Sequence, residues 1–156
     1  MPRFEMNEQQ IDDFLQKQHT ASLSLVDEDG VPYCVPVHFA QATGSFYIHS
    51  SSSGKKLDII AKSKGMINSC LTVFDIEGYK YKSDDNPCRI STKFNSVIII
   101  GKAEIVSDYD EKINALKAIV NKLAPDFSAD KMLKAAIEAV TIIKINPIKV
   151  TTKAYM

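Results

Sequence analysis

The stretch ASLSLVDEDGVPYCVPVHF, residues 21–39, contains two apolar runs separated by a polar turn. In the first run Ala21, Leu23 and Leu25 alternate with serines, and in the second run every other residue from Val31 to Phe39 is apolar. Alternation with a period of two is typical of β-strands that bury one face, and Asp-Glu-Asp-Gly offers a tight turn between them. The stretch therefore predicts an antiparallel β-hairpin.

Elements on either side extend this hairpin. Before it, Asn7 and Gln10 have the spacing of a capping box and predict a helix from about Glu8 to Gln18. After it, the turn residues Thr43–Ser45 precede a short strand, Phe46–His49, which we expect to run antiparallel to the second strand of the hairpin. The first 50 residues thus predict a helix followed by three connected strands.

The rest of the chain alternates strands with short helices. We expect a helix ending near Ser63, a strand over 66–76, a polar loop over 78–89, a strand over 96–106, a helix from Asp108 to Pro125, a helix near 131–139 and a strand over 140–152 bent at Asn146-Pro147. The strand over 96–106 is apolar on both faces in its first half, which predicts a second covering layer, and another subunit is one source of it. Hairpin-connected strands with peripheral helices predict a mainly β fold, a closed or nearly closed antiparallel barrel, as one domain over 1–156.

Charge and cysteine content narrow the class of protein. Nineteen basic residues balance nineteen acidic ones, so nucleic acid is a weak candidate as a partner. No stretch reaches membrane-spanning length, and the polar N-terminus does not predict export. The three cysteines lack Cys-x-x-Cys spacing and the three histidines lack carboxylates at ligand spacing, so we expect reduced thiols, no metal site and a cytoplasmic location.

The segment FYIHSSSSGKKLDII, residues 46–60, carries the main candidate site. It is not a nucleotide-binding P-loop, because His49 replaces the first glycine and Lys56 replaces the Ser/Thr that holds magnesium. Its hydroxyl groups, glycine, lysines and helix N-terminus nevertheless suit a phosphate monoester. Taken alone, such a segment is more often a solvated loop, so the neighbouring strand has to decide between the two interpretations.

The neighbouring strand contains Pro36, which cannot donate a backbone hydrogen bond. We therefore expect this strand to lie at an edge or an opening of the barrel, where backbone groups remain unpaired. Such an edge can hydrogen-bond the polar rim of a flat heterocycle such as a flavin. An ordinary edge proline without a ligand explains the same residue equally well.

With these features the chain resembles the FMN-binding split barrels of the pyridoxamine 5'-phosphate oxidase-like superfamily, and most of all the nitroimidazole-resistance (Nim) proteins. The resemblance rests on residues 21–39 and 46–60, on FNSVIIIGKAEIV (94–106) and on IIKINPIKVTTKAY (142–155), in this order. It implies a Greek-key antiparallel split β-barrel that forms a homodimer, with FMN at the subunit interface. The residues that it assigns to FMN are the backbone of Val35, Pro36, Val37, His38 and Phe39 at the ring, His49, Ser50, Lys55 and Lys56 at the phosphate, and Asn95 and Ser96 from the second subunit.

Departures from the family pattern narrow the implied activity. Relatives often have arginine where Asn95 stands, the true oxidases have arginine at Val35, and their C-terminal tryptophan has no match in a chain without tryptophan. The resemblance therefore implies an FMN-dependent, nitroreductase-like oxidoreductase that passes electrons from a donor, expected to be a nicotinamide, to a small aromatic or nitro compound. His38, which shares a strand face with Pro36, is the candidate catalytic residue. The alternatives are a non-enzymatic flavin- or haem-related binding protein and a barrel with an empty site that serves only for interaction.

Overall fold

A computed structural model describes residues 4–63, 66–81 and 86–155. In chain order the elements are α1 (Glu8–Lys17), β1 (Thr20–Val26), β2 (Pro32–His38), β3 (Ala40–Ala42), β4 (Ser45–Ser50), α2 (Lys55–Lys62), β5 (Met66–Lys80), the 3-10 turn η1 (Pro87–Arg89), β6 (Ser91–Ile105), α3 (Tyr109–Leu123), the 3-10 turn η2 (Ala129–Lys131), α4 (Lys134–Ala139) and β7 (Thr141–Tyr155).

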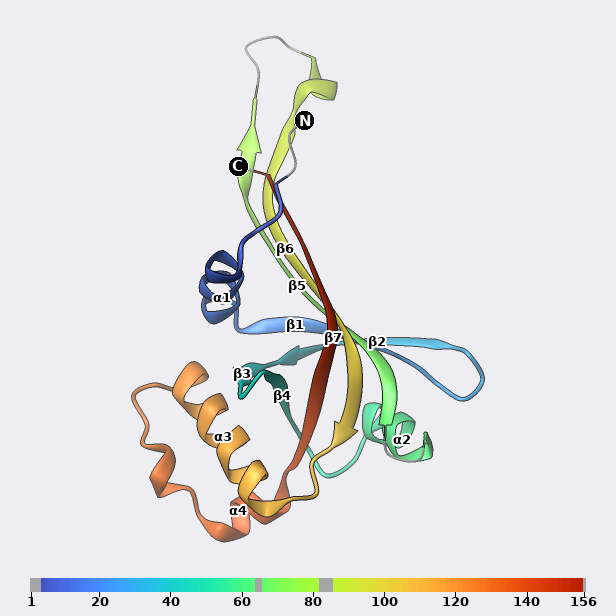
Figure 1. The fold of residues 1–156 in the computed structure, drawn as a ribbon, viewed down its shortest axis with the longest axis vertical. Coiled ribbons are helices and arrows are strands. Elements are labelled where there is room, and N and C mark those ends of the chain that lie inside the picture. Colours follow the sequence, from blue (N-terminus) through green and yellow to red (C-terminus); the bar gives the residue numbers. More distant parts are fainter. Residues whose placement is uncertain (1–3, 64–65, 82–85, 156) are drawn as a thin grey trace.

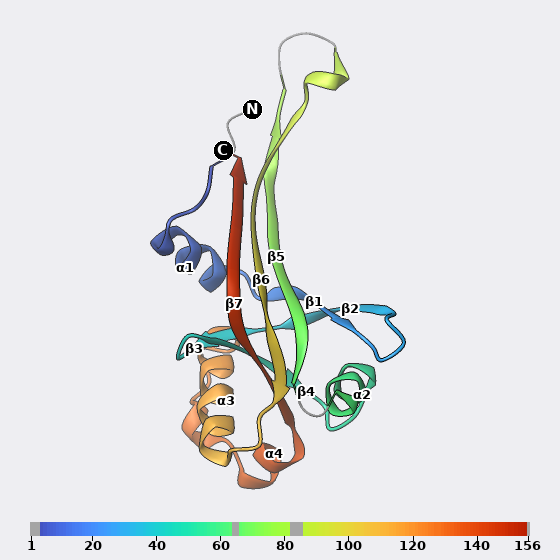
Figure 2. The same cartoon turned by 45° about the vertical axis from the view of Figure 1, so that its right-hand side comes forward.

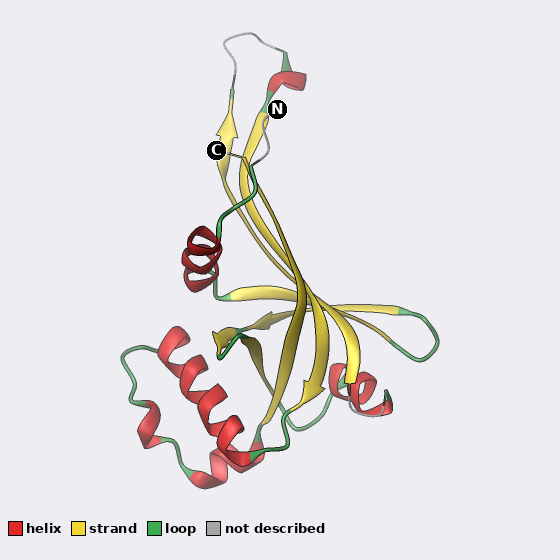
Figure 3. Ribbon diagram, in the orientation of Figure 1, coloured by secondary structure: helices red, strands yellow, loops and turns green. Residues whose placement is uncertain are grey.

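The strands form one antiparallel sheet in the order β2-β1-β5-β6-β7-β4-β3. The long strands β5, β6 and β7 run the length of the molecule and bend, while β1 and β2 run across them (Figures 1 and 2). The helices lie around the curled sheet (Figure 3), with α3 packed on β3 and β4. The prediction of a mainly β, antiparallel split barrel with peripheral helices is confirmed.

The hairpin and the first helix form as predicted. β1 and β2 pair in a register that places Ser22 opposite Pro36, and the Asp27 carboxylate accepts hydrogen bonds from turn backbone N–H groups. α1 begins with the predicted capping box, because the Asn7 side chain accepts from the Gln10 N–H and the Gln10 side chain accepts from the Asn7 N–H. β2 is the first strand of the sheet, so the prediction that Pro36 lies on an edge strand is confirmed.

The predicted pairing of Phe46–His49 with the second strand is wrong. β4 instead pairs with β3 on one side and with β7 on the other. Phe39 explains the difference: its side chain is fully buried, with its ring 6.3 Å from that of Phe46, and the chain leaves the β2 ladder there. The next three residues, Ala40–Ala42, form the separate strand that completes a hairpin with β4.

The polar segment after Ile76 is not the long loop that we predicted. β5 continues past a register shift to Lys80, where it pairs with Ser91 at the start of β6, and the two strands form an arm that projects beyond the barrel (Figure 1). Both faces of a two-stranded arm can meet water, so the burial pattern that we used to find strands does not apply there. Residues 82–85 of the predicted loop lie outside the described residues.

The last helix and strand differ from the prediction mainly at their ends. α4 begins only at Lys134, and β7 continues to Tyr155. The expected bend in β7 appears as a register shift against β6 beside Pro147. Gly101 on β6 permits this arrangement, because a Cβ atom there would lie 2.3 Å from the backbone oxygen of Asn146.

One face of β6 packs into the barrel core and the other is incompletely covered. Val97 and Ile99 are fully buried, whereas Ile98 is half-buried and Ile100 is 46% exposed. The second covering layer that the sequence predicted is therefore not supplied by the described part of this chain.

Candidate functional site

A hollow of about 340 Å³ lies where β2, the end of β4 and the start of α2 meet. The residues that line it are Thr20, Pro36, Val37, His38, His49 and Lys56. Five of these six were assigned to the cofactor from the sequence. These five residues come from two strands and a helix and lie up to 20 positions apart in the sequence, and the structure brings them together.

Alternation along β2 divides its residues between the outside and the core. Pro36 and His38 are exposed, while Val35 and Val37 are half-buried against the core and Phe39 is fully buried. Because β2 is the first strand of the sheet, one side of its backbone has no partner strand among the described residues. A ligand beside β2 would therefore meet its backbone and the side chains of Pro36 and His38.

The ring of His38 is held by the backbone. Its Nδ1 lies 3.2 Å from the carbonyl oxygen of His19, the second of the two residues between α1 and β1. In the β1–β2 ladder His38 is opposite Thr20, which brings Thr20 into the hollow. The sequence reasoning missed Thr20, because counting back from the predicted turn at 27–30 pairs it with Val37, one residue away from the observed partner.

The hollow is electropositive. Among the described residues that line it, Lys56 is cationic, two are histidines and none is a carboxylate. The pKa of His49 is lowered from its usual value, first because the protein partly desolvates the ring and second because the Lys56 ammonium is nearby. Both causes favour neutral His49 near pH 7, so an anion bound here would meet one fixed positive charge and polar ring nitrogens.

Two hydrogen-bonding groups at the β4–α2 junction are left without partners. The Ser50 side chain is 3% exposed, and among the described residues no group hydrogen-bonds its Oγ. Gly54, whose φ of 131° suits only glycine, is the N-cap residue before α2, and within the described residues no side chain caps this helix. Buried hydroxyls and helix N-termini normally find partners, and oxyanions commonly provide them.

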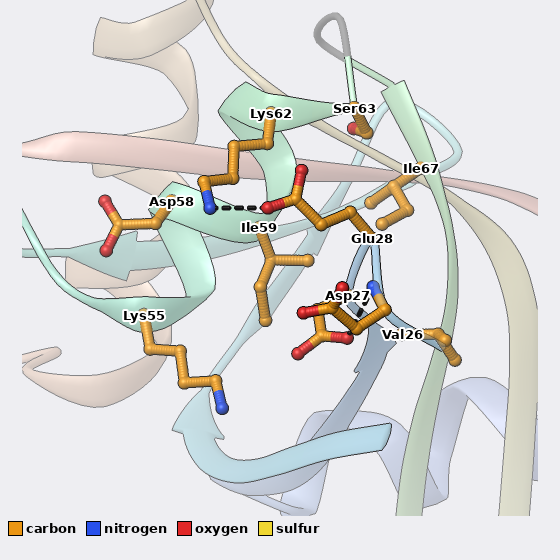
Figure 4. A pocket seen from close by; sticks show the side chains of 10 residues that line it. Val26, Asp27, Glu28, Lys55, Asp58, Ile59, Lys62, Ser63 and Ile67 are labelled. Carbon is orange, nitrogen blue, oxygen red and sulfur yellow. Dashed lines mark hydrogen bonds and ion pairs between the residues drawn. The ribbon is translucent and has the colours of Figure 1, made fainter. Parts of the chain in front are cut away.

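Lys55 is not brought into this hollow. Its Nζ lies 5.2 Å from the centre of the Tyr33 ring, and its side chain lines a second hollow of about 390 Å³ on another side of α2 (Figure 4). Four carboxylates line that second hollow, those of Asp27, Glu28, Asp29 and Asp58. Lys62 also lines it and pairs with Glu28 at 2.7 Å. The larger of the two hollows is thus unsuited to phosphate.

Asn95 and Ser96 are also separate from the hollow in this chain. They are adjacent on β6 and point to opposite faces of the sheet. The Asn95 amide donates to the Glu77 carboxylate at 2.6 Å, in a groove beside α1, and the Ser96 hydroxyl lies 3.4 Å from the Lys153 carbonyl oxygen. Their assignment to FMN from a second subunit stays a prediction.

The described residues show few other chemical features. They contain no cluster of His, Cys, Asp or Glu able to hold a metal ion. All three cysteines, Cys34, Cys70 and Cys88, have free thiols. In the same ranges of the chain, every helix is too short or too polar to span a membrane.

The family described as pyridoxamine 5'-phosphate oxidase matches residues 7–154 of the chain. A candidate 5-nitroimidazole antibiotic resistance protein from Bacteroides thetaiotaomicron is similar in structure, with 24% identity, a TM-score of 0.79 and coverage of 97% of this chain and 87% of that one. The flavocytochrome Anf3 from Azotobacter vinelandii has 22% identity and a TM-score of 0.78, over 96% and 68% of the two chains. An FAD- and haem-binding protein from Mycobacterium smegmatis has 20% identity and a TM-score of 0.82, over 99% and 73%. Curated proteins give no match.

Proposed function

Because the chain belongs to the pyridoxamine 5'-phosphate oxidase family, whose model matches residues 7–154, we propose that it is an FMN-dependent oxidoreductase of the Nim-like group. The observation that carries this proposal is the electropositive hollow at the end of β2. The β4–α2 junction that borders it also contains a buried hydroxyl without a partner among the described residues, that of Ser50, which does not itself line the hollow, and a helix that no described side chain caps. FMN carries a terminal phosphate and a flat ring, and the two parts of this site suit those two groups.

The junction of β4 and α2 fits the phosphate end. Lys56 would supply the positive charge, the first N–H groups of α2 would donate hydrogen bonds, and the Ser50 hydroxyl would gain the partner that it lacks. A charge-assisted hydrogen bond contributes about 1.5–3 kcal/mol, so a few such contacts hold a phosphate monoester. His49 at the end of β4 completes this end of the site.

The free backbone edge of β2 fits the flavin ring. Val35 to Phe39 would face the ring through main-chain groups, with the Pro36 and His38 side chains on the same exposed side. When bound, FMN accepts electrons from a donor, which we propose to be a nicotinamide, and passes them to a small aromatic or nitro compound. His38 is the candidate catalytic residue because its ring lines the hollow, and Nε2 is the nitrogen that would face a ligand, since Nδ1 is held by the His19 carbonyl.

Strand register supports a homodimer with the site at its interface. Pro36 lies opposite Ser22, Ser22 opposite Thr72, and Thr72 opposite Ile98, so one face of the sheet runs from the hollow to β6. This is the face on which Ile98 and Ile100 lack a covering layer. A second subunit on this face would bury those side chains, border the hollow and bring its own β6, with Ser96 and Asn95, towards the cofactor. Free thiols fit a cytoplasmic location.

Haem binding is the second candidate function. Haem iron needs a histidine whose coordinating nitrogen is free, and ligating histidines usually donate their other N–H to a carbonyl or carboxylate. His38 meets both conditions, since Nδ1 faces the His19 carbonyl and the ring lines an open hollow. The similar M. smegmatis protein binds both FAD and haem. A Soret band on titration with haemin that disappears in His38→Ala would support this function.

Purified protein tests the proposed function directly. We expect a yellow protein, or one that becomes yellow with FMN, whose absorbance bleaches with NADH or NADPH and returns when a nitroaromatic compound is added. Bleaching that the nitroaromatic compound does not reverse would show electron transfer from the nicotinamide but not to that acceptor. FMN binding without any bleaching would leave only cofactor binding, and absence of FMN binding would overturn the proposal.

A further inference from the structure

The two ring nitrogens of His38 have different roles. A backbone carbonyl oxygen only accepts hydrogen bonds, so the 3.2 Å contact with the His19 oxygen places the proton of neutral His38 on Nδ1. Nε2 then carries a lone pair and acts as an acceptor. The His38 side chain is exposed and lines the hollow, so this acceptor is available to a ligand.

The other polar side chains of the hollow do not duplicate this role. The Lys56 ammonium only donates, and the Thr20 hydroxyl donates or accepts as its partner requires. The ring of His49 is not held by a hydrogen bond to any described residue, so neither of its tautomers is selected. His38 is therefore the side chain in the hollow whose acceptor character the backbone fixes.

We infer that His38 Nε2 accepts a hydrogen bond from a ring N–H group of the bound heterocycle, and so selects ligands that carry an imide-type N–H. This inference rests on the proposed function and names one recognition contact within it. The oxidised flavin ring has a single N–H, at N3, flanked by two carbonyl groups. β2 has no partner strand on one side among the described residues, so its main-chain N–H groups on that side, which Pro36 lacks, are open to those carbonyls.

A flavin analogue methylated at N3 tests the contact, because it cannot donate a hydrogen bond there. We expect wild-type protein to bind N3-methyl-FMN about five- to tenfold more weakly than FMN, the effect of one hydrogen bond. His38→Leu should bind FMN with a similar loss and should not distinguish the two ligands. The cycle of two proteins and two ligands separates the hydrogen bond from the bulk of the methyl group.

His19→Ala is the matched control. It removes a side chain but keeps the backbone carbonyl that holds His38, so it should discriminate between FMN and N3-methyl-FMN as the wild type does. Nitrogen-15 NMR of the ligand-free protein near pH 8 gives an independent readout, and we expect the His38 proton on Nδ1 in both wild type and His19→Ala.

Equal affinity of wild type for FMN and N3-methyl-FMN would overturn this inference and leave the proposed function intact. A His38 proton found on Nε2 would overturn it in the same way. Failure of the wild type to bind either flavin would instead overturn the proposed function, and this inference with it.

Discussion

The two hollows beside α2 differ in charge although one short helix borders both. The first holds Lys56 and two histidines and no carboxylate among the described residues, while the second is lined by four carboxylates, one of which pairs with Lys62. Lys55 and Lys56 are neighbours in sequence, yet successive residues of a helix point about 100° apart, so each lysine serves a different hollow. Two lysines that are adjacent in sequence therefore do not form one anion site, and variants of each lysine test this difference.

The largest expected effect comes from Lys56→Ala. Loss of the only ammonium in the first hollow among the described residues should weaken FMN binding by about 1.5–3 kcal/mol, measured by calorimetric titration. Lys55→Ala is the control on the same helix, and it should leave the affinity nearly unchanged because its ammonium lies against Tyr33. Equal losses in both variants would show that the two hollows act as one site.

Ser50→Ala should have the next largest effect. We expect FMN affinity to fall by about 1 kcal/mol, since the phosphate would lose one hydrogen bond. The free energy of unfolding of the ligand-free protein should not fall, because the described residues give the Ser50 hydroxyl no partner to lose. A clear loss of stability in urea unfolding without ligand would show that this hydroxyl is already satisfied.

The pKa of His49 reports the charge of the first hollow without any ligand. Lys56→Met should raise this pKa, though not to its usual value of 6.5, because desolvation is the larger cause of the lowering. A histidine NMR titration measures it, with Lys55→Met as the control that should produce no change. A rise in Lys55→Met equal to that in Lys56→Met would contradict the separation of the two lysines.

The same lowered pKa makes stability depend on pH. The unfolded chain binds a proton at His49 more readily than the folded chain, so the free energy of unfolding should decrease as the pH falls through about 6.5 and level off below the folded pKa. His49→Gln should remove this part of the pH dependence, which urea unfolding at several pH values would show. An unchanged slope would mean that other groups cause it.

The smallest effect is expected from the second hollow. The Lys62–Glu28 pair is 2.7 Å long, but the two side chains are 61% and 59% exposed, so solvent screens the attraction. Lys62→Ala should lower the urea midpoint slightly and leave FMN affinity unchanged. A marked loss of FMN affinity would assign the anionic hollow to the cofactor site.

Local sequence signals predicted the elements of the fold that depend on nearby residues. The capping box of α1, the β1–β2 hairpin and the edge position of Pro36 follow from side chains within a few residues of one another. The partners of β4 did not, because the burial of Phe39 in the core ends β2, and that core includes residues as far along the chain as Ile143 and Ile145. The β5–β6 arm was missed because its polar residues carry no alternating pattern.

The candidate site, like the fold, was predictable from sequence only where nearby residues determine it. The β2 residues and the His49–Lys56 segment could be found from sequence, and the structure gathers Pro36, Val37, His38, His49 and Lys56 in one hollow. The separation of Lys55 from Lys56 depends on how α2 is rotated against the barrel, which a run of sequence letters does not reveal. The contact of His38 with the His19 carbonyl likewise depends on strand register and on the end of α1.

The central claim is that the hollow beside Lys56 binds a phosphate group. Paired titrations with FMN and riboflavin test this claim most directly. The two ligands share the flavin ring and differ in the phosphate. We expect wild-type protein to bind FMN much more tightly than riboflavin, and the difference to shrink in Lys56→Ala but not in Lys55→Ala. If riboflavin bound wild-type protein as tightly as FMN does, the phosphate would not be held there and the account would be contradicted.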